Sequence, residues 1–293
     1  MVAADANAVL VTGAAGGIGS ITVDLLHSHG FRVYAGVRPV GQAADLRTRE
    51  NPARDVTFVE MDVADSGSVA GAVAAVSAML TQRNERLVGV VNMATVEYHG
   101  PLEILPLKFV RRELEVNYLG ALSVTRGFLP LLRPAGGRIV NISSINGLCV
   151  FPSIGASCAS KYALEAMSDA LRLELRPWGL RVILIEPGAV ATKLWDKTLA
   201  AFQELPSHVT PSDLHRYYPS WPQALARARR DKVRLLRLAS PPQRVAETVV
   251  KALTDRRPKT RYLVGWDARA ISFARWLLPD QVFDALARRT FHE

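Results

Sequence analysis

A glycine-rich turn near the start of the chain is the clearest chemical feature of the sequence. It reads Thr12-Gly13-Ala14-Ala15-Gly16-Gly17-Ile18-Gly19, directly after an apolar run and directly before an amphipathic stretch. Glycine permits positive φ and close approach of a ligand to the backbone, and the N-terminus of the following helix offers N–H groups to a pyrophosphate. In this strand-to-helix position the turn predicts a dinucleotide site, with contacts from Thr12, Gly13, Gly17, Ile18 and Gly19.

The end of the second expected strand bears on which dinucleotide would bind. A carboxylate there would bind the ribose hydroxyls and repel a 2′-phosphate, but the run FRVYAGV is followed by Arg38. An arginine can hold a phosphate through charge-assisted hydrogen bonds, although an unpartnered surface arginine is the alternative. We therefore expect NADP(H) rather than NAD(H). Asp62 and Val63 end the third strand, where they would meet the adenine edge, and Asp62 could equally cap the loop.

An alternation of strands and helices must position these residues. Short runs rich in β-branched residues predict strands at 8–12, 31–37, 56–63, 87–93, 137–143, 180–187 and 261–265. Amphipathic stretches predict helices that include 105–132, 156–175, 241–253 and a terminal one that ends near Arg289. Near-continuous apolar strands joined by helices indicate an α/β fold, a Rossmann-type doubly wound parallel sheet with helices on both faces. No linker rich in Pro, Gly or Ser divides the chain, so we expect residues 1–293 to form one domain.

Composition narrows the class of protein. The hydrophobic fraction of 49% is ample for a buried core, and without a leader-like or membrane-length apolar run we expect a cytoplasmic protein. Cys149 and Cys158 are expected to be free thiols, and no histidine or cysteine spacing predicts a metal site. The net charge is +9, but the basic residues are scattered apart from the stretch 227–237, which we interpret as a solvated helix face rather than a nucleic-acid site.

Further motifs follow the glycine turn in order: Asn117 in EVNYLG, Ser144 in NISSING, Lys161 in CASKYALEAM, and Pro187-Gly188 followed by Thr192. Together they resemble the short-chain dehydrogenase/reductase family, in its hydroxysteroid- or retinol-dehydrogenase-like branch, over nearly the whole chain. The resemblance implies about seven strands, a homodimer or homotetramer, and hydride transfer between a nicotinamide cofactor and a small carbonyl or alcohol. It also implies cofactor contacts from Asn92, Lys161, Pro187, Gly188 and Thr192.

The sequence departs from the family pattern at the position of the residue that transfers the proton. In that family a tyrosine transfers the proton, a serine binds the reacting oxygen, a lysine lowers the tyrosine pKa, and an asparagine holds a water beside the lysine. Asn117, Ser144 and Lys161 match three of these, but the spacing from both Ser144 and Lys161 puts Ser157 at the tyrosine position. A serine hydroxyl is too weak an acid and too short for that role. Tyr162 is a poor substitute, because it lies about 140° from Ser157 on the helical wheel.

A second segment departs from the family pattern as well. The chain has Asn92-Met93-Ala94-Thr95 where the family usually has Asn-Asn-Ala-Gly, which favours natural divergence over a single deliberate substitution at Ser157. By the family's layout the next residues border the substrate, and Glu97, Tyr98 or His99 could transfer a proton or simply be solvated. Asn146 is either a polar contact for the substrate or a turn former.

Two later segments lack a decodable motif. Residues 193–240 interrupt the strand and helix rhythm and are expected to cover a site, with Trp195, Phe202 and Trp221 lining an apolar pocket or packing the segment itself. The terminal helix carries Phe273, Trp276, Leu277 and Leu278, for which we expect core or subunit packing rather than a membrane surface.

These residues leave three hypotheses for function. The first is an NADP(H)-dependent oxidoreductase for a hydrophobic carbonyl or alcohol, in which a water or Tyr98 replaces the missing acid. The second is a cyclase, dehydratase or isomerase in which Glu97, Tyr98 or His99 does acid and base chemistry. The third is an inactive cofactor-binding protein. The first stands slightly ahead of the second, because Asn117, Ser144 and Lys161 all remain.

Overall fold

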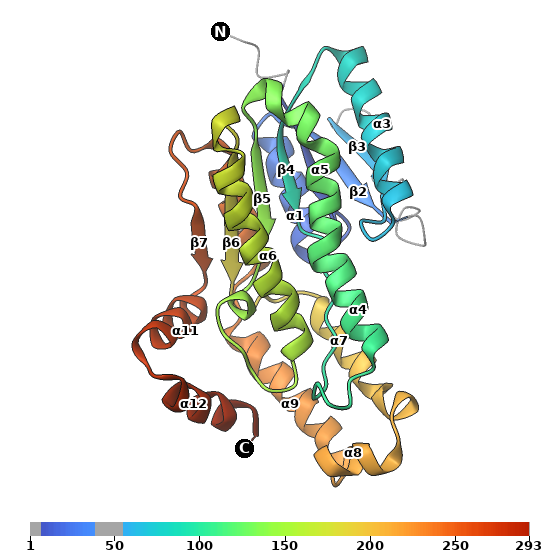
Figure 1. The fold of residues 1–293 in the computed structure, drawn as a ribbon, viewed down its shortest axis with the longest axis vertical. Helices are drawn as coiled ribbons and strands as arrows, with labels where there is room; N and C mark the ends of the chain where they lie inside the picture. Colours follow the sequence, from blue (N-terminus) through green and yellow to red (C-terminus); the bar gives the residue numbers. More distant parts are fainter. Residues whose placement is uncertain (1–6, 39–54, 293) are drawn as a thin grey trace.

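A parallel sheet forms the centre of the fold (Figure 1). The computed structural model describes residues 7–38 and 55–292, and seven strands within these ranges pair in the order β3-β2-β1-β4-β5-β6-β7. All six strand pairings are parallel. The strands are β1 (Asn7–Thr12), β2 (Arg32–Val37), β3 (Val56–Glu60), β4 (Arg86–Asn92), β5 (Arg138–Ile142), β6 (Arg181–Pro187) and β7 (Arg261–Val264). The doubly wound α/β sheet that the sequence predicts is therefore confirmed.

Helices cover both faces of the sheet, which is why its strands are apolar almost throughout. On one face α1 (Gly17–Ser28) packs beside α10 (Pro242–Thr254), with Val23, Leu26, Val245 and Val249 in the buried cluster. The other face is covered by α3 (Ser66–Arg83), α5 (Ala121–Leu132) and α6 (Gly155–Glu174), which lie together in front of the sheet in Figure 1. A strand buried on both sides has no polar face to display.

A buried polar ladder joins the middle strands to two of these helices. Asn92 donates to the hydroxyl of Thr125 at 3.0 Å and to the side-chain oxygen of Asn141 at 2.8 Å. Asn141 in turn donates to the hydroxyl of Ser168 at 2.8 Å. Because unpaired amides are expensive to bury, this ladder fixes how β4 and β5 face α5 and α6.

The single long helix expected over 105–132 is instead interrupted. It consists of α4 (Leu107–Leu114), a π-helical turn η2 (Glu115–Gly120) and α5. A Cβ on Gly120 would lie 2.8 Å from Cγ2 of Val63, so the turn packs tightly on the loop after β3. Single π-helical turns insert an extra residue, and this one carries Asn117.

The carboxyl ends of the strands meet at one edge, and most of the additional helices lie beyond it (Figure 1). Residues 193–240 form α7 (Leu194–Gln203), the 3₁₀ turn η6 (Leu205–His208), α8 (Pro211–Tyr217) and α9 (Trp221–Leu238). The stretch 227–237 lies on α9, which has no fully buried residue. This edge is where doubly wound folds bind their ligands.

The prediction of a single terminal helix is wrong. This segment divides into α11 (Trp266–Leu277) and α12 (Asp280–His292), because Pro279 lacks the N–H that would continue the helix. Packing of its aromatic face into the core of this chain is also wrong, since Phe273 is 59% exposed and Trp276 is 79% exposed. No helix among the described residues is long and apolar enough to cross a membrane.

The layered core makes a direct prediction about stability. Leu132 is fully buried under the sheet, whereas Leu238 at the end of α9 is 56% exposed. We expect Leu132→Ala to lower the free energy of unfolding by about 2–5 kcal/mol, because the deletion leaves a cavity. The same deletion at Leu238 should change it by less than about 0.5 kcal/mol. Urea unfolding followed by circular dichroism measures both, and equal losses would contradict the burial of Leu132 in a packed core.

Candidate active site

The glycine turn is built as the sequence predicts. Gly13 has φ of +65°, and a Cβ there would lie 2.9 Å from the backbone nitrogen of Ala94. A Cβ on Gly19 would lie 2.2 Å from the carbonyl oxygen of Gly13, so the first turn of α1 folds directly onto the loop. No side chain caps the N-terminus of α1, and no acidic residue occupies its first turn. These backbone surfaces and the positive end of the helix fit a dinucleotide pyrophosphate.

The residues that flank this turn have mixed roles. The Thr12 hydroxyl accepts from the N–H groups of Met93 and Ala94, at 3.0 and 3.2 Å, and so ties the end of β1 to the end of β4. Arg38 is exposed at the end of β2. Asp62 accepts from the N–H of Ala64 at 3.0 Å, which is the loop-capping geometry, and Val63 is buried.

The loop after β6 is held from the far end of the chain. The N–H of Ala189 donates to Oδ2 of Asp267 at 2.7 Å, and the N–H of Gly188 donates to the carbonyl of Val264 at 3.0 Å. A Cβ on Gly188 would lie 2.1 Å from that Oδ2. Asp267, in the first turn of α11, therefore holds the Pro187–Gly188 loop, and only glycine fits beneath it. Thr192 closes the loop, lying 3.1 Å from where a Cβ on Gly17 would be.

Lys161 is buried at the carboxyl end of β5. Its Nζ donates to the carbonyl oxygen of Ile142 at 3.0 Å, and the residue is 7% exposed. Burial lowers the pKa of Lys161 to about 8, and the nearby carboxylates of Glu97, Glu113 and Glu165 oppose that shift. A lysine with a pKa in this range can change its charge near neutral pH.

Ser144 and Ser157 approach the same region from two elements. The Ser144 hydroxyl caps the 3₁₀ turn η4 (Ile145–Gly147), accepting from the N–H of Asn146 at 3.2 Å and donating to the carbonyl of Pro187 at 3.4 Å. Asn146 therefore lies within this turn, with its backbone N–H bound to Ser144. Ser157 lies in the first turn of α6, one turn before Lys161, and is 3% exposed.

The comparisons with known proteins agree with this arrangement. A family model described as short chain dehydrogenase matches residues 7–202. The chain belongs to the short-chain dehydrogenase family. It is 33% identical to the 17-beta-hydroxysteroid dehydrogenase type 6 of Bos taurus, over 97% of this chain and 88% of the relative.

Two solved structures have the same fold. A short chain dehydrogenase of Burkholderia cenocepacia J2315 in complex with NADP is 25% identical, covers 99% of both chains and gives a TM-score of 0.71. A short chain dehydrogenase/reductase of Burkholderia phymatum in complex with NAD is 23% identical, covers 94% of this chain and 95% of its own, and gives a TM-score of 0.77. The likeness to the second shows the fold alone.

In this short-chain dehydrogenase the side chain of Asn117 is fully engaged by protein groups. Its Oδ1 accepts from the hydroxyl of Thr95 at 3.0 Å and the N–H of Val96 at 2.9 Å. Its Nδ2 donates to the carbonyl of Val96 at 2.9 Å and to the hydroxyl of Ser160 at 3.0 Å. An amide has two acceptor and two donor positions, so the hydrogen-bonding capacity is filled. Thr95, one of the departures from the family pattern, supplies one of these bonds.

Asn92 also uses its side chain within the protein. It is 5% exposed and belongs to the buried ladder with Thr125 and Asn141. Its Oδ1 has no hydrogen-bond partner among the described residues.

Glu97 and His99 form a pair beside Lys161. Nε2 of His99 lies 3.2 Å from Oε1 of Glu97, and the two side chains are 26% and 18% exposed. Burial by itself would raise the pKa of Glu97, but the hydrogen bond with His99 and the charges of His99 and Lys161 lower it overall. A carboxylate, an imidazole and an amine thus lie within electrostatic reach of one another, and all three are group types that can transfer protons.

The two tyrosines considered as replacements have different surroundings. The Tyr98 ring stacks on Phe109 of α4, with centroids 4.5 Å apart and planes at 13°. This stack packs against the cluster that includes Leu105 and Phe202. Tyr162 is 41% exposed and faces Arg275 on α11, which agrees with the helical-wheel expectation that it points away from Ser157.

The aromatic residues of the segment 193–240 pack mainly on one another. The Phe202 ring lies 4.9 Å from that of Trp221 and 5.6 Å from that of Tyr218. Nε1 of Trp195 donates to the carbonyl of Val190 at 2.9 Å. Phe202 and Trp221 therefore pack on each other and in the cluster with Leu105, Tyr98 and Phe109.

Sequence reasoning missed one buried acid in this region. Glu113 on α4 has no exposed surface, and its Oε1 accepts from the N–H of Tyr98 at 2.6 Å. Burial raises the pKa of Glu113 to about 8, and the charge of Glu97 adds to the shift. In the sequence Glu113 lies within the charged stretch RRELE, which reads as an exposed helix surface. Its position four residues before Asn117 is the signal that could have placed it on the same helix face as Asn117.

A second set of acids lies between α6, β6 and β7. Arg261 contacts Glu165, Glu186 and Asp169, and burial raises the pKa of Glu186 to about 7. Both cysteines are buried free thiols, as expected. Within residues 7–38 and 55–292, no group of histidines, cysteines and acids has the arrangement of a metal site.

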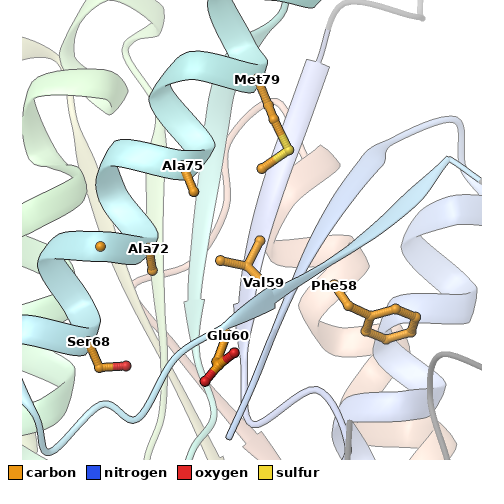
Figure 2. A pocket seen from close by; sticks show the side chains of 8 residues that line it. Phe58, Val59, Glu60, Ser68, Ala72, Ala75 and Met79 are labelled. Atoms are coloured by element: carbon orange, nitrogen blue, oxygen red, sulfur yellow. The ribbon is translucent and has the colours of Figure 1, made fainter. Parts of the chain in front are cut away.

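Figure 2 shows a pocket of about 400 Å³ on another part of the molecule. It lies between β3 and α3, and its lining consists of Phe58, Val59, Glu60, Ser68, Gly71, Ala72, Ala75 and Met79. None of the candidate active-site residues borders it, so we do not assign it to the reaction.

The contact between Gly188 and Asp267 can be tested by a double-mutant cycle. We expect Gly188→Ala to lower the free energy of unfolding by about 2 kcal/mol or more, because its Cβ would overlap the carboxylate. In the background of Asp267→Ala the same change should be much less harmful, with a coupling of about 1–3 kcal/mol. Gly71→Ala is the control, since a Cβ at Gly71 meets nothing within 4 Å. Additive losses in the cycle would contradict the contact.

Proposed function

We propose that this protein is an NADP(H)-dependent oxidoreductase for a hydrophobic carbonyl or alcohol, in which Glu97 and His99 handle the proton that the family's tyrosine would. The observation that carries the proposal is the Glu97–His99 pair, at 3.2 Å, lying within electrostatic reach of the buried Lys161. The tyrosine position itself is Ser157, whose short aliphatic hydroxyl cannot supply a phenol's acidity.

The cofactor would lie along the edge formed by the glycine turn and the Pro187–Thr192 loop. The close approaches at Gly13, Gly17 and Gly19 leave backbone surfaces that a side chain would fill. Bound NADPH would supply hydride to the substrate carbon. The exposed Arg38 at the end of β2 supports NADP(H), because its guanidinium can pair with a 2′-phosphate. The two solved structures of the same fold hold NADP in one case and NAD in the other. The proposed preference for NADP(H) therefore rests on Arg38 alone.

The proton chemistry would be shared among residues on three elements. The Ser144 hydroxyl, which makes only a 3.4 Å contact as donor, can turn toward a substrate oxygen. His99 can donate a proton to that oxygen while Glu97 stabilises the imidazolium, and the charge of Lys161 favours negative charge nearby. A water between Ser157 and the substrate would fill the space left by the missing ring.

The substrate class is proposed from the cover over this edge. The segment 193–240 brings Phe202, Trp221 and Tyr218 together with Tyr98 and Phe109 beyond the strand ends. Such an apolar cover suits a hydrophobic substrate, and one relative is named a hydroxysteroid dehydrogenase. We further propose that residues 1–293 act as one domain in a cytoplasmic homodimer or homotetramer.

An enzyme without redox chemistry is the second candidate. The Glu97–His99 pair favours it, because a carboxylate and an imidazole could isomerise or dehydrate a substrate without a hydride donor. The two candidates differ in whether turnover consumes NADPH.

Cofactor preference is tested at Arg38. We expect Arg38→Ala to weaken NADPH binding by roughly 10- to 100-fold and NADH binding by less than about threefold, because one charge-assisted phosphate contact is lost. Calorimetric titration measures both, and Arg237→Ala on α9 is the control. A parallel loss for the two cofactors would exclude 2′-phosphate recognition by Arg38.

The reaction is tested with NADPH and a panel of hydrophobic ketones. We expect substrate-dependent loss of nicotinamide absorbance, and Glu97→Gln or His99→Asn should reduce kcat by roughly a hundredfold or more. His29→Asn, at an exposed histidine, should not. Product formation without NADPH consumption would favour the non-redox candidate. No turnover by either route would contradict both candidate functions.

Replacement of Ser157 separates an intact redox site from a rebuilt one. If Ser157→Tyr raises turnover strongly, the remaining residues still form the family's site. If turnover does not rise although the variant is folded and binds NADPH, then the pocket around Glu97 and His99 has diverged from tyrosine chemistry.

A further inference from the structure

Glu113 is a fully buried acid that the proposed reaction does not yet use. It lies on α4 with no exposed surface, and its Oε1 accepts a single N–H, from Tyr98 at 2.6 Å. Its Oε2 is buried and has no hydrogen-bond partner among the described residues. A charged carboxylate in such a place would lack most of the hydrogen bonds it requires.

The charges around Glu113 decide which group carries a proton. Glu97 faces it from the loop after β4, and Lys161 and Cys158 face it from α6, while His99 is bound to Glu97. Lys161 and the protonated form of His99 together can balance Glu97, but no further cation among the described residues is directed at Glu113. The proton therefore resides most favourably on Oε2 of Glu113, and Glu97 stays ionised.

The bond to Tyr98 gives Glu113 a second effect. Tyr98 lies between Glu97 and His99 in the chain, so the acid on α4 fixes the backbone of the segment that carries both. The stacking of Tyr98 on Phe109 anchors that same segment to the same helix. Glu113 thus acts on the pair through position as well as through charge.

We propose that Glu113 is a positioning residue of the active site: its carboxyl carries a proton at neutral pH and holds the Glu97–His99 segment, and its ionised form at higher pH favours the charged form of Lys161. This inference rests on the proposed function for its effect on turnover, but its structural part does not. When Glu113 ionises, at a pH of about 8, its new charge helps Lys161 to keep its proton.

The sign of the pH effect follows from these charges. Lys161 has its pKa lowered by burial, and the charge of Glu113 partly offsets that shift. Glu113→Gln keeps an acceptor for the N–H of Tyr98 but can never ionise, so Lys161 should lose its proton at lower pH. Any activity that needs charged Lys161 should then decline at a lower pH in Glu113→Gln than in the wild-type protein.

The first measurement is infrared spectroscopy of the protein without substrate. In a Glu186→Gln background at pH 6.5, the otherwise wild-type protein should show the carbonyl stretch of a protonated carboxyl, which should be lost in Glu113→Gln but kept in the exposed control Glu115→Gln. Because Glu186 can contribute a similar band, all samples carry Glu186→Gln. Absence of the band in the otherwise wild-type sample overturns the inference, even if Glu113→Gln does not fold.

The second measurement is the pH dependence of kcat. Glu113→Gln should move the alkaline limb to lower pH by about half a unit or more, while Glu115→Gln leaves it in place. If the infrared band is present but the alkaline limb of the kcat profile does not shift, the proposed effect of Glu113 on the protonation of Lys161 is overturned. Failure of the proposed oxidoreductase function appears differently, as no NADPH-dependent turnover in any variant, and leaves the infrared result to decide whether Glu113 is neutral.

Discussion

The contact between the ends of β1 and β4 is the constraint on which the whole site depends. These strands are neighbours in the sheet although β2 and β3 lie between them in sequence, so the strand order reverses here. Thr12 bonds the N–H groups of Met93 and Ala94, and Gly13 packs on Ala94. The glycine turn and the loop that carries Glu97 and His99 are therefore parts of one junction, at the switch point where doubly wound sheets bind ligands.

Around that junction lie the residues that match the family's motifs. Lys161 stays at the end of β5, Ser144 stays on the adjacent turn, and Asn117 stays on the π-helical turn. In the proposed reaction, Glu97 and His99 take the place of a phenol. A buried lysine requires compensating negative charge, and two acids in different surroundings lie near it. Glu97, paired with His99, remains ionised, whereas the isolated Glu113 takes a proton.

The loops that would enclose a cofactor are tied to parts of the chain remote in sequence. Asp267 reaches back to Ala189, and Thr95 together with Ser160 completes the bonding of Asn117. These contacts fix the backbone shape of the loops. They also explain why Gly188 is a glycine, since the carboxylate of Asp267 occupies the space of a Cβ.

The sequence alone determined the features that are local in the chain. Periodicity predicted the strands and most helices, and the position of the glycine turn predicted a loop between the first strand and the first helix. The family resemblance, with the spacing from Ser144 and Lys161, indicated Ser157 at the tyrosine position. Tertiary structure alone decided which face each polar side chain occupies. Glu113 reads as one charge among several yet is fully buried, and Asn92 is the last residue of a strand yet bonds within the core. The physical reason is that burial and pairing arise from contacts between distant segments, which no local pattern of residues records.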